Sequence, residues 1–281
     1  MTDTAKIINE LLPKMTKTES KIAGLYLNDP ESFALDTLDA LACAAKTSTT
    51  SIIRFCRRVG FDGFKSFQDA VRADLKYRQS LPDKLLSTVS GGTDSLFIKT
   101  LEKTTDCIRE SFGGISQDVL TAATDIISTA NSVYTFGMRE SFALSHYAYT
   151  RFLSVRKDVK ILKADGERLA ETLLGIKKGD ACVAFLFHRY TKNALGILKF
   201  LKEKGASVIL VTAPPFDKIS DKASLVIPCY TEIGGIKNSF AAPVCICDYL
   251  CSAVAAKLAD EALDYMKEAE TLFCELDILA D

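Results

Sequence analysis

The chain has 281 residues, with 35 Lys and Arg against 36 Asp and Glu, so its formal net charge is −1 at pH 7. This balance excludes a strongly basic protein that coats nucleic acid, and it excludes an acidic disordered tail. Hydrophobic residues make up 48% of the chain and charged residues 25%, a composition typical of soluble globular proteins. The length favours two domains over a single one.

Nine cysteines form an odd set, and the start Met1-Thr2-Asp3-Thr4 carries no basic segment followed by an apolar one. We therefore expect reduced thiols and a cytoplasmic protein. No uninterrupted apolar run reaches the length of about 18 residues that a membrane span needs, so no membrane partner is expected. The spacing of Cys245, Cys247 and Cys251 matches no common zinc pattern and favours buried thiols on a packed helix. We expect no metal and no cofactor.

Pro82, the pair Gly91-Gly92 and several hydroxyl residues mark residues 79–95 as a break in the chain. No strand pattern precedes this break, whereas apolar runs rich in β-branched residues alternate with helical periods after it. The sequence therefore predicts an all-α domain at 1–78, a linker at 79–94 and an α/β domain at 95–281. Before the break, helical spacing and stop signals predict helices near 7–12, 21–27, 37–42, 49–59 and 65–77.

After the break, helices are predicted at 94–112, 117–129, 141–153 and 192–204, and strands at 132–136, 158–162, 181–187, 207–212 and 224–228. Continuous apolar strands that alternate with helices indicate a parallel sheet with both faces covered. Ligands of such sheets bind at the carboxyl ends of the strands. The loops after Phe136, Phe187, Thr212 and Pro228 are therefore where a ligand site is expected.

The segments 37–42 and 49–59 are joined by the short polar interval Lys46-Thr47-Ser48, which is typical of a helix-turn-helix. Ile52, Phe55, Cys56 and Val59 would bury one face of the second helix, and the opposite face is basic. From Ala40 through Phe61 there are four bases and no acid. The alternative is a solvated basic face without a partner. The residues predicted to contact DNA are Ser48, Thr49, Thr50, Ser51, Arg54, Arg57 and Arg58.

The run Arg54-Phe55-x4-Gly60-Phe61-x-Gly63-Phe64, together with Thr18-Glu19-Ser20-Lys21-Ile22-Ala23, resembles the N-terminal domain of RpiR-type bacterial transcriptional regulators. The family couples this domain to a sugar-isomerase-type (SIS) domain with a flavodoxin-like sheet, and the elements after residue 94 follow a similar order. The family usually has Gly and then Val in the helix-turn-helix turn, where this chain has Lys46 and Thr47. A left-handed position there would cost Lys46 about 1 kcal/mol.

The resemblance also implies a phosphosugar loop, Ser-x-Ser-Gly-x-Thr, after a central strand. The corresponding run here is Leu186-Phe187-His188-Arg189-Tyr190-Thr191, which keeps only the final Thr191 and has Arg189 in place of the glycine. Arg189 and Arg139 are expected to reach one crevice, and two guanidinium groups near helix N-termini would favour an anion. The residues predicted for this effector site are Gly137, Arg139, Ser141, His188, Arg189, Tyr190, Thr191 and Glu232. The alternative is that Arg139 forms a structural ion pair with Glu140 or Glu232.

These features predict a DNA-binding transcriptional regulator with no catalytic residues. Its partners would be a double-stranded DNA operator, a small anionic metabolite such as a phosphosugar, and further copies of the chain in a homodimer or homotetramer. Two other readings stay open. One is an enzyme related to sugar-phosphate isomerases, with His188 or Glu232 as the base. The other is a ligand-blind repressor that uses the SIS fold only to oligomerise. His146, beside Tyr147 and Tyr149 on a helix, is predicted to be a packed or interfacial residue.

Overall fold

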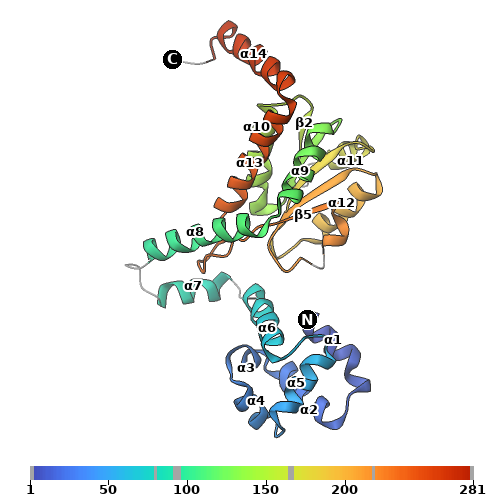
Figure 1. Ribbon diagram of the computed structural model, residues 1–281, viewed down its shortest axis with the longest axis vertical. Helices are drawn as coiled ribbons and strands as arrows, with labels where there is room; N and C mark the ends of the chain where they lie inside the picture. The colour runs from blue at the N-terminus through green and yellow to red at the C-terminus, as the bar shows by residue number, and fades with distance from the viewer. Residues whose placement is uncertain (1–2, 79–80, 91–95, 164–167, 217–218, 279–281) are drawn as a thin grey trace. The chain divides into compact units, whose positions relative to one another are not determined.

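The computed structural model describes residues 3–78, 81–90, 96–163, 168–216 and 219–278. The chain divides into two compact units, Met1–Asp83 and Lys84–Asp281, which are described separately below (Figure 1). The division falls inside the segment 79–94 that the sequence assigns to a linker; the exact domain limits stay a prediction.

The first unit is helical throughout its described residues. Its helices are α1 (Asp3–Leu11), the 3-10 turn η1 (Leu12–Lys14), α2 (Lys17–Asn28), α3 (Pro30–Leu35), α4 (Leu38–Ala44), α5 (Thr49–Arg58) and α6 (Phe64–Arg78). Local hydrogen bonds set several of these helix starts. Thr16 and Glu19 form a reciprocal capping box at the start of α2, and Thr37 Oγ1 accepts a bond from Ala40 N at the start of α4.

Aromatic rings hold the helices of this unit together. Phe67 of α6 lies 5.5 Å from Tyr26, 5.9 Å from Phe33 and 6.0 Å from Phe55, in each case edge to face. Such contacts add to the free energy gained by burying the rings. Phe61 packs against Phe67 at 5.2 Å. These phenylalanines therefore belong to the core of the helical unit.

The second unit is built on a five-stranded sheet of β1 (Val133–Gly137), β2 (Val159–Leu162), β3 (Ala181–Phe185), β4 (Ser207–Thr212) and β5 (Leu225–Pro228). The order is β2-β1-β3-β4-β5, and every neighbouring pair is parallel. Its helices are α7 (Leu81–Ser90), which begins in the first unit, α8 (Leu96–Gly114), α9 (Gln117–Thr129), η2 (Arg139–Ser141), α10 (Phe142–Leu153), α11 (Leu169–Leu174), α12 (Lys192–Glu203), η3 (Ser220–Lys222), α13 (Ala241–Leu258) and α14 (Asp260–Glu275).

Side chains alternate between two cores, one on each face of the sheet. Val183 and Phe185 of β3 join the core formed with α8, α9, α10 and α13. Cys182 and Ala184 join the core beneath α11 and α12. Burial on both faces explains why these strands read as continuous apolar runs. The predicted fold class, a helical region followed by a covered parallel α/β sheet, is confirmed.

Helix α13 is predominantly apolar. Of the described helices, it is long and apolar enough by composition to cross a membrane, with a mean hydropathy of 1.4. Its side chains Ile246, Leu250 and Val254 are buried in the core of the sheet unit, so we assign α13 as a core helix. Cys247 and Cys251 are buried on it, as the sequence predicts, whereas Cys245 is only half-buried. Burial raises the pKa of Cys251.

Parts of the predicted element list are wrong. Residues 81–90, read as loop, form helix α7, because Pro82 stands in the first turn, where a missing N–H costs no hydrogen bond. Helix α3 is likewise opened by Pro30 and capped by Asp29, residues that the sequence indicates as a stop. Helices α11 and α14 were not predicted. Predicted strand ends agree with the structure to within two residues.

Candidate functional site

The turn between α4 and α5 has the geometry that ends a helix with a left-handed residue. Lys46 N donates to Cys43 O at 3.0 Å and Thr47 N donates to Ala42 O at 2.9 Å, the paired bonds of a Schellman motif. Lys46 has φ +50°, the left-handed conformation that glycine adopts most readily. Lys46 therefore occupies a left-handed turn position at the place where the related family usually has glycine.

Helix α5 begins at a side-chain cap and buries one face. Ser48 Oγ accepts a bond from Ser51 N at 3.3 Å and lies 3.0 Å from Ser51 Oγ. Ile52 and Phe55 are fully buried against α2, α4 and α6. Burial raises the pKa of Cys56 to about 12, so this thiol is neutral and inert. These contacts fix which face of α5 is presented to solvent.

The exposed face of α5 carries the residues predicted to contact DNA. Arg54 is exposed and, within residues 3–78, has neither a hydrogen bond nor an ion pair. Arg57 Nε donates to Asp62 O at 3.2 Å, and Arg58 Nη2 donates to Lys14 O at 3.2 Å. Each of these two guanidinium groups keeps further N–H groups that can donate hydrogen bonds to a phosphate. Thr50 is exposed and Thr49 is half-buried.

In the sheet unit, the predicted effector residues follow β1 and β3, two strands that lie side by side with Gly137 opposite Phe185. The chain crosses from β1 to β2 on one side and reaches β3 on the other, so this is the topological switch point at which such sheets bind ligands. Gly137 is needed there. A Cβ on it would lie 2.2 Å from Ser141 O, because the turn η2 folds back over the strand end.

Both predicted arginines hold a left-handed backbone. Arg139 has φ +54° and Arg189 has φ +73°, and the side chains of both are exposed. Arg189 thus keeps the conformation that the glycine of a phosphosugar loop would adopt. Strain of this kind persists where surrounding structure imposes it, and it clusters at ligand sites.

Two contacts link the loop after β3 to the loop after β1 and to the end of β4. Thr191 Oγ1 caps α12 by accepting from Ala194 N at 3.2 Å and lies 3.2 Å from Met138 Sδ in the loop after β1. Tyr190 OH lies 3.4 Å from Thr212 Oγ1 at the end of β4. Ser141 precedes α10, as the sequence predicts, but it is buried and its side chain makes no cap.

His188 lies against the loop after β4. Its Nε2 is 3.3 Å from Pro214 O, and its ring is 5.2 Å from that of Tyr190. Burial lowers the pKa of His188, while the carbonyl groups of Pro214 and Ala213 and the charge of Glu232 oppose this shift. His188 is therefore a neutral hydrogen-bonding group near pH 7. Glu232 follows β5, as predicted.

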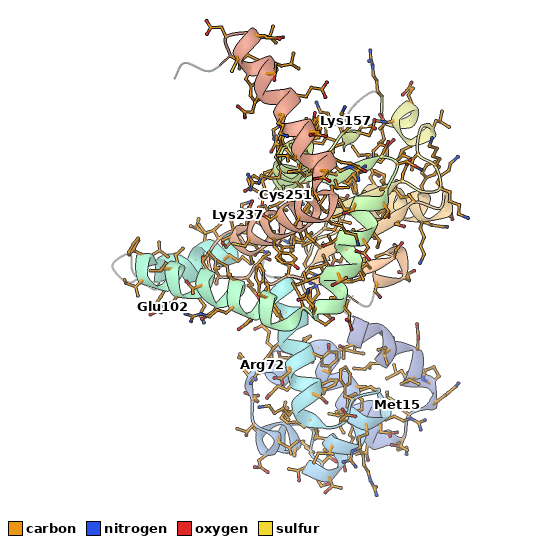
Figure 2. The ribbon with its side chains drawn as sticks, turned by 45° about the horizontal axis from the view of Figure 1, so that its top comes forward. Met15, Arg72, Glu102, Lys157, Lys237 and Cys251 are labelled. Carbon is orange, nitrogen blue, oxygen red and sulfur yellow. The ribbon has the colours of Figure 1, made fainter. Side chains whose placement is uncertain are left out.

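Sequence reasoning missed a link across the site. Lys237, in the loop after β5, forms an ion pair with Glu140 of η2 (Figure 2). The same loop is tied to helix α8, because Ser111 Oγ accepts from Tyr230 N at 2.8 Å. No local signal identifies a pair that is 97 residues apart in sequence. Glu140 is thus engaged by Lys237, and the alternative in which it neutralises Arg139 is not what the structure has.

A cavity of about 480 Å³ lies elsewhere, next to the residues that precede β2. It is lined by four carboxylates, from Asp158, Glu261, Asp264 and Glu268, and by two cations. Arg156 already donates to Ile127 O and Ala130 O. The four carboxylates of this cavity disfavour an anion, so it is not a candidate phosphosugar site.

Comparison with known families and proteins agrees with this geometry. Residues 2–77 match the helix-turn-helix domain of the rpiR family, and residues 126–253 match the SIS domain. An uncharacterized HTH-type transcriptional regulator of Caldanaerobacter subterraneus is 24% identical over 273 residues, which cover 95% of this chain and 95% of that protein. HexR, an HTH-type transcriptional regulator of Escherichia coli, is 23% identical over 94% of this chain and 91% of its own.

Solved structures of similar fold cover the whole chain or the sheet unit. The Vibrio vulnificus NanR protein complexed with ManNAc-6P has a TM-score of 0.57 and 16% identity, over 99% of this chain and 100% of that one. The sugar isomerase domain of an RpiR transcription factor from Sphaerobacter thermophilus has a TM-score of 0.60 and 19% identity, over 63% of this chain and 99% of that one. At these identities the likeness shows the fold.

Proposed function

The chain is a transcriptional regulator that joins an RpiR-family helix-turn-helix domain to a SIS domain, and from this premise we propose that the SIS domain senses a small anionic metabolite, a phosphosugar or a related acid, and changes operator binding. The observation that carries the proposal is the pair of exposed arginines, Arg139 and Arg189, held left-handed at the two loops beside the switch point. The NanR neighbour was solved with ManNAc-6P, a ligand of the proposed class.

For the DNA side, we propose that α5 lies in the major groove and that two copies of the chain read two half-sites. Ser48, Thr49, Thr50 and Ser51 would meet phosphates and base edges at the start of the helix. Arg54 has no internal partner in the described chain, so its guanidinium can contact a guanine edge bidentately.

The test begins with DNA selected from a random double-stranded pool by the full-length protein. At fixed salt, we expect Arg54→Ala to weaken binding to the selected sequence by about tenfold or more, because a bidentate base contact in each half-site is lost. The control is Lys65→Ala, which removes an exposed charge from α6. Unchanged affinity for Arg54→Ala would overturn the assignment of α5 as the reading helix.

For the effector side, the charge and hydrogen-bonding groups define the ligand class. Arg139, Arg189 and Lys237 supply positive charge, which suits a phosphate or carboxylate group. His188 in its neutral form and Tyr190 can bond to hydroxyl groups, and Glu232 can accept from one. We propose that the ligand anion competes with Glu140 for Lys237, and that the loop after β5 passes this change to α8 through Tyr230 and Ser111.

Thermal unfolding of the full-length protein tests the site. The probes are ManNAc-6P, glucose 6-phosphate and inorganic phosphate at constant ionic strength. A binding sugar phosphate should raise the unfolding temperature of the wild type, and Arg139→Ala and Arg189→Ala should remove that shift. Lys178→Ala, which removes a charge from the turn before β3, is the matched control. Normal shifts in both arginine variants would place the site elsewhere, and no shift with any probe would favour a ligand-blind repressor.

We propose binding without turnover. The serines of the phosphosugar loop are absent, and one ring nitrogen of His188 already faces Pro214 O. Incubation with the same sugar phosphates, followed by NMR, should show no isomerisation. Turnover that disappears in Glu232→Gln would replace this proposal with the enzyme reading.

A further inference from the structure

The first half of helix α8 carries apolar side chains that the rest of the sheet unit does not cover. Ile98 is 51% exposed and Leu101 is 57% exposed. In Figure 1 this half of α8 extends past the helices that cover the sheet. In the second half, Cys107 and Ser111 are buried against the domain and fix the orientation of the helix.

The apolar positions repeat every three or four residues along one side. Ile98, Leu101, Ile108 and Phe112, with Thr105 between them, follow the spacing of a two-helix seam. Ile98, Leu101 and Phe112 are exposed, and Ile108 is half-buried against the core of the sheet unit. The midpoint of this set is Thr105, a small residue flanked at equal distances by Ile98 and Phe112. If a second copy of this helix ran antiparallel and crossed at Thr105, Ile98 of each helix would lie beside Phe112 of the other.

The charges beside the seam select this orientation. Glu102, labelled in Figure 2, and Arg109 are exposed and lie seven residues apart on the same edge of the helix. Neither has a hydrogen bond or ion pair within the described part of the chain. In an antiparallel pair, each Glu102 faces the partner's Arg109. In a parallel pair, this edge would instead meet Thr104 and the buried Ser111, which carry no charge.

We propose that α8 is the docking surface for a second copy of this chain, with the two helices antiparallel across Thr105 and two reciprocal Glu102–Arg109 pairs beside the apolar seam. The surface is self-complementary, as the interface of a two-fold dimer must be. The proposal gives the interface for the homo-oligomer in the proposed function. It is tested without DNA or effector, so its failure leaves the roles of Arg54, Arg139 and Arg189 untouched.

The experiment is a charge swap in the full-length protein, read by sedimentation equilibrium. Glu102→Arg and Arg109→Glu should each place like charges together twice in the dimer and raise its dissociation constant by about tenfold or more. The double variant Glu102→Arg/Arg109→Glu restores both pairs and should dimerise like the wild type. Circular dichroism confirms that the helices are intact.

Glu110→Arg is the matched control, because Glu110 is exposed on the side of α8 opposite the seam; it should dimerise normally. Leu101→Asp should give a monomer. A wild-type protein that stays monomeric, single reversals that dimerise normally, or a double variant that is not rescued would each overturn the proposal.

Discussion

The left-handed residue in the turn between α4 and α5 gives a sharp test of how this turn is stabilised. Lys46 has φ +50° and is exposed. A left-handed conformation costs a residue with a Cβ about 1–2 kcal/mol. Glycine removes this cost but adds about 0.4–1 kcal/mol of unfolded-chain entropy. Lys46→Gly should therefore stabilise the helical unit by a net amount of about 0.7 kcal/mol.

The assay is amide hydrogen exchange of the full-length protein, followed by mass spectrometry of peptides from α5. Exchange of buried helical amides reports the free energy of opening the unit. A gain of about 0.7 kcal/mol corresponds to exchange that is about threefold slower. Full-length protein is used so that the helical unit remains in its own chain.

The matched control is Ala44→Gly, two residues earlier, at the exposed last residue of α4. Glycine relieves no strain there and should destabilise the unit by about 0.5–1 kcal/mol. The two glycine substitutions are thus predicted to change the stability of the helical unit in opposite directions. If Lys46→Gly speeds exchange as Ala44→Gly does, the turn carries no left-handed strain and the reasoning is refuted.

Two further predictions concern the sheet unit. Gly137→Ala should lower the free energy of unfolding by about 2 kcal/mol, because the added Cβ would lie 2.2 Å from Ser141 O; Gly196→Ala, with open space around it, is the control, and equal stability in thermal unfolding would refute the close approach. Burial lowers the pKa of His188, so the unfolded chain takes up a proton first and stability falls as the pH drops below about 6.5, the ordinary value. His188→Gln should flatten the dependence of the unfolding temperature on pH between 5 and 7, whereas His146→Gln, at an exposed position, should leave the slope unchanged.

Sequence periodicity predicts the sheet well because burial on both faces leaves a direct trace in composition. The run beginning at Ala181 is apolar at every position through Phe187, and the strand Ala181–Phe185 lies within it. Sequence periodicity did not predict helices α3 and α7. Pro30 and Pro82 indicate breaks, yet a proline in the first turn is also compatible with a helix start, and local sequence does not separate the two.

Of the two candidate sites, one could be predicted from local sequence spacing and the other depends on contacts between distant segments. The basic face of α5 follows from spacing within ten residues, so Ser48 and Arg54 could be placed from the sequence. The crevice depends on loops from separate strands. That Glu140 is held by Lys237, 97 residues away, is a tertiary fact without a local signal. His146 is exposed, because the face of α10 that meets the sheet is set by Leu144 and Ala148; of the two predicted roles, packed or interfacial, the interfacial one stays a prediction.

Both candidate sites contain non-glycine residues with a left-handed backbone. Six non-glycine residues in the described chain have positive φ, and three of them, Lys46, Arg139 and Arg189, are cations in the turns predicted to be functional. Asp158 and Asp277 belong to a residue type that tolerates this conformation. A turn that served only to reverse the chain would be more stable with glycine, since each Cβ costs about 1 kcal/mol or more. The proposed function gives the side chains of Arg139 and Arg189 a role that glycine could not fill, which is to bind an anion at the loops after β1 and β3. The net charge of the whole chain, −1, does not reveal these positive charges. They are confined to two turns and one helix face.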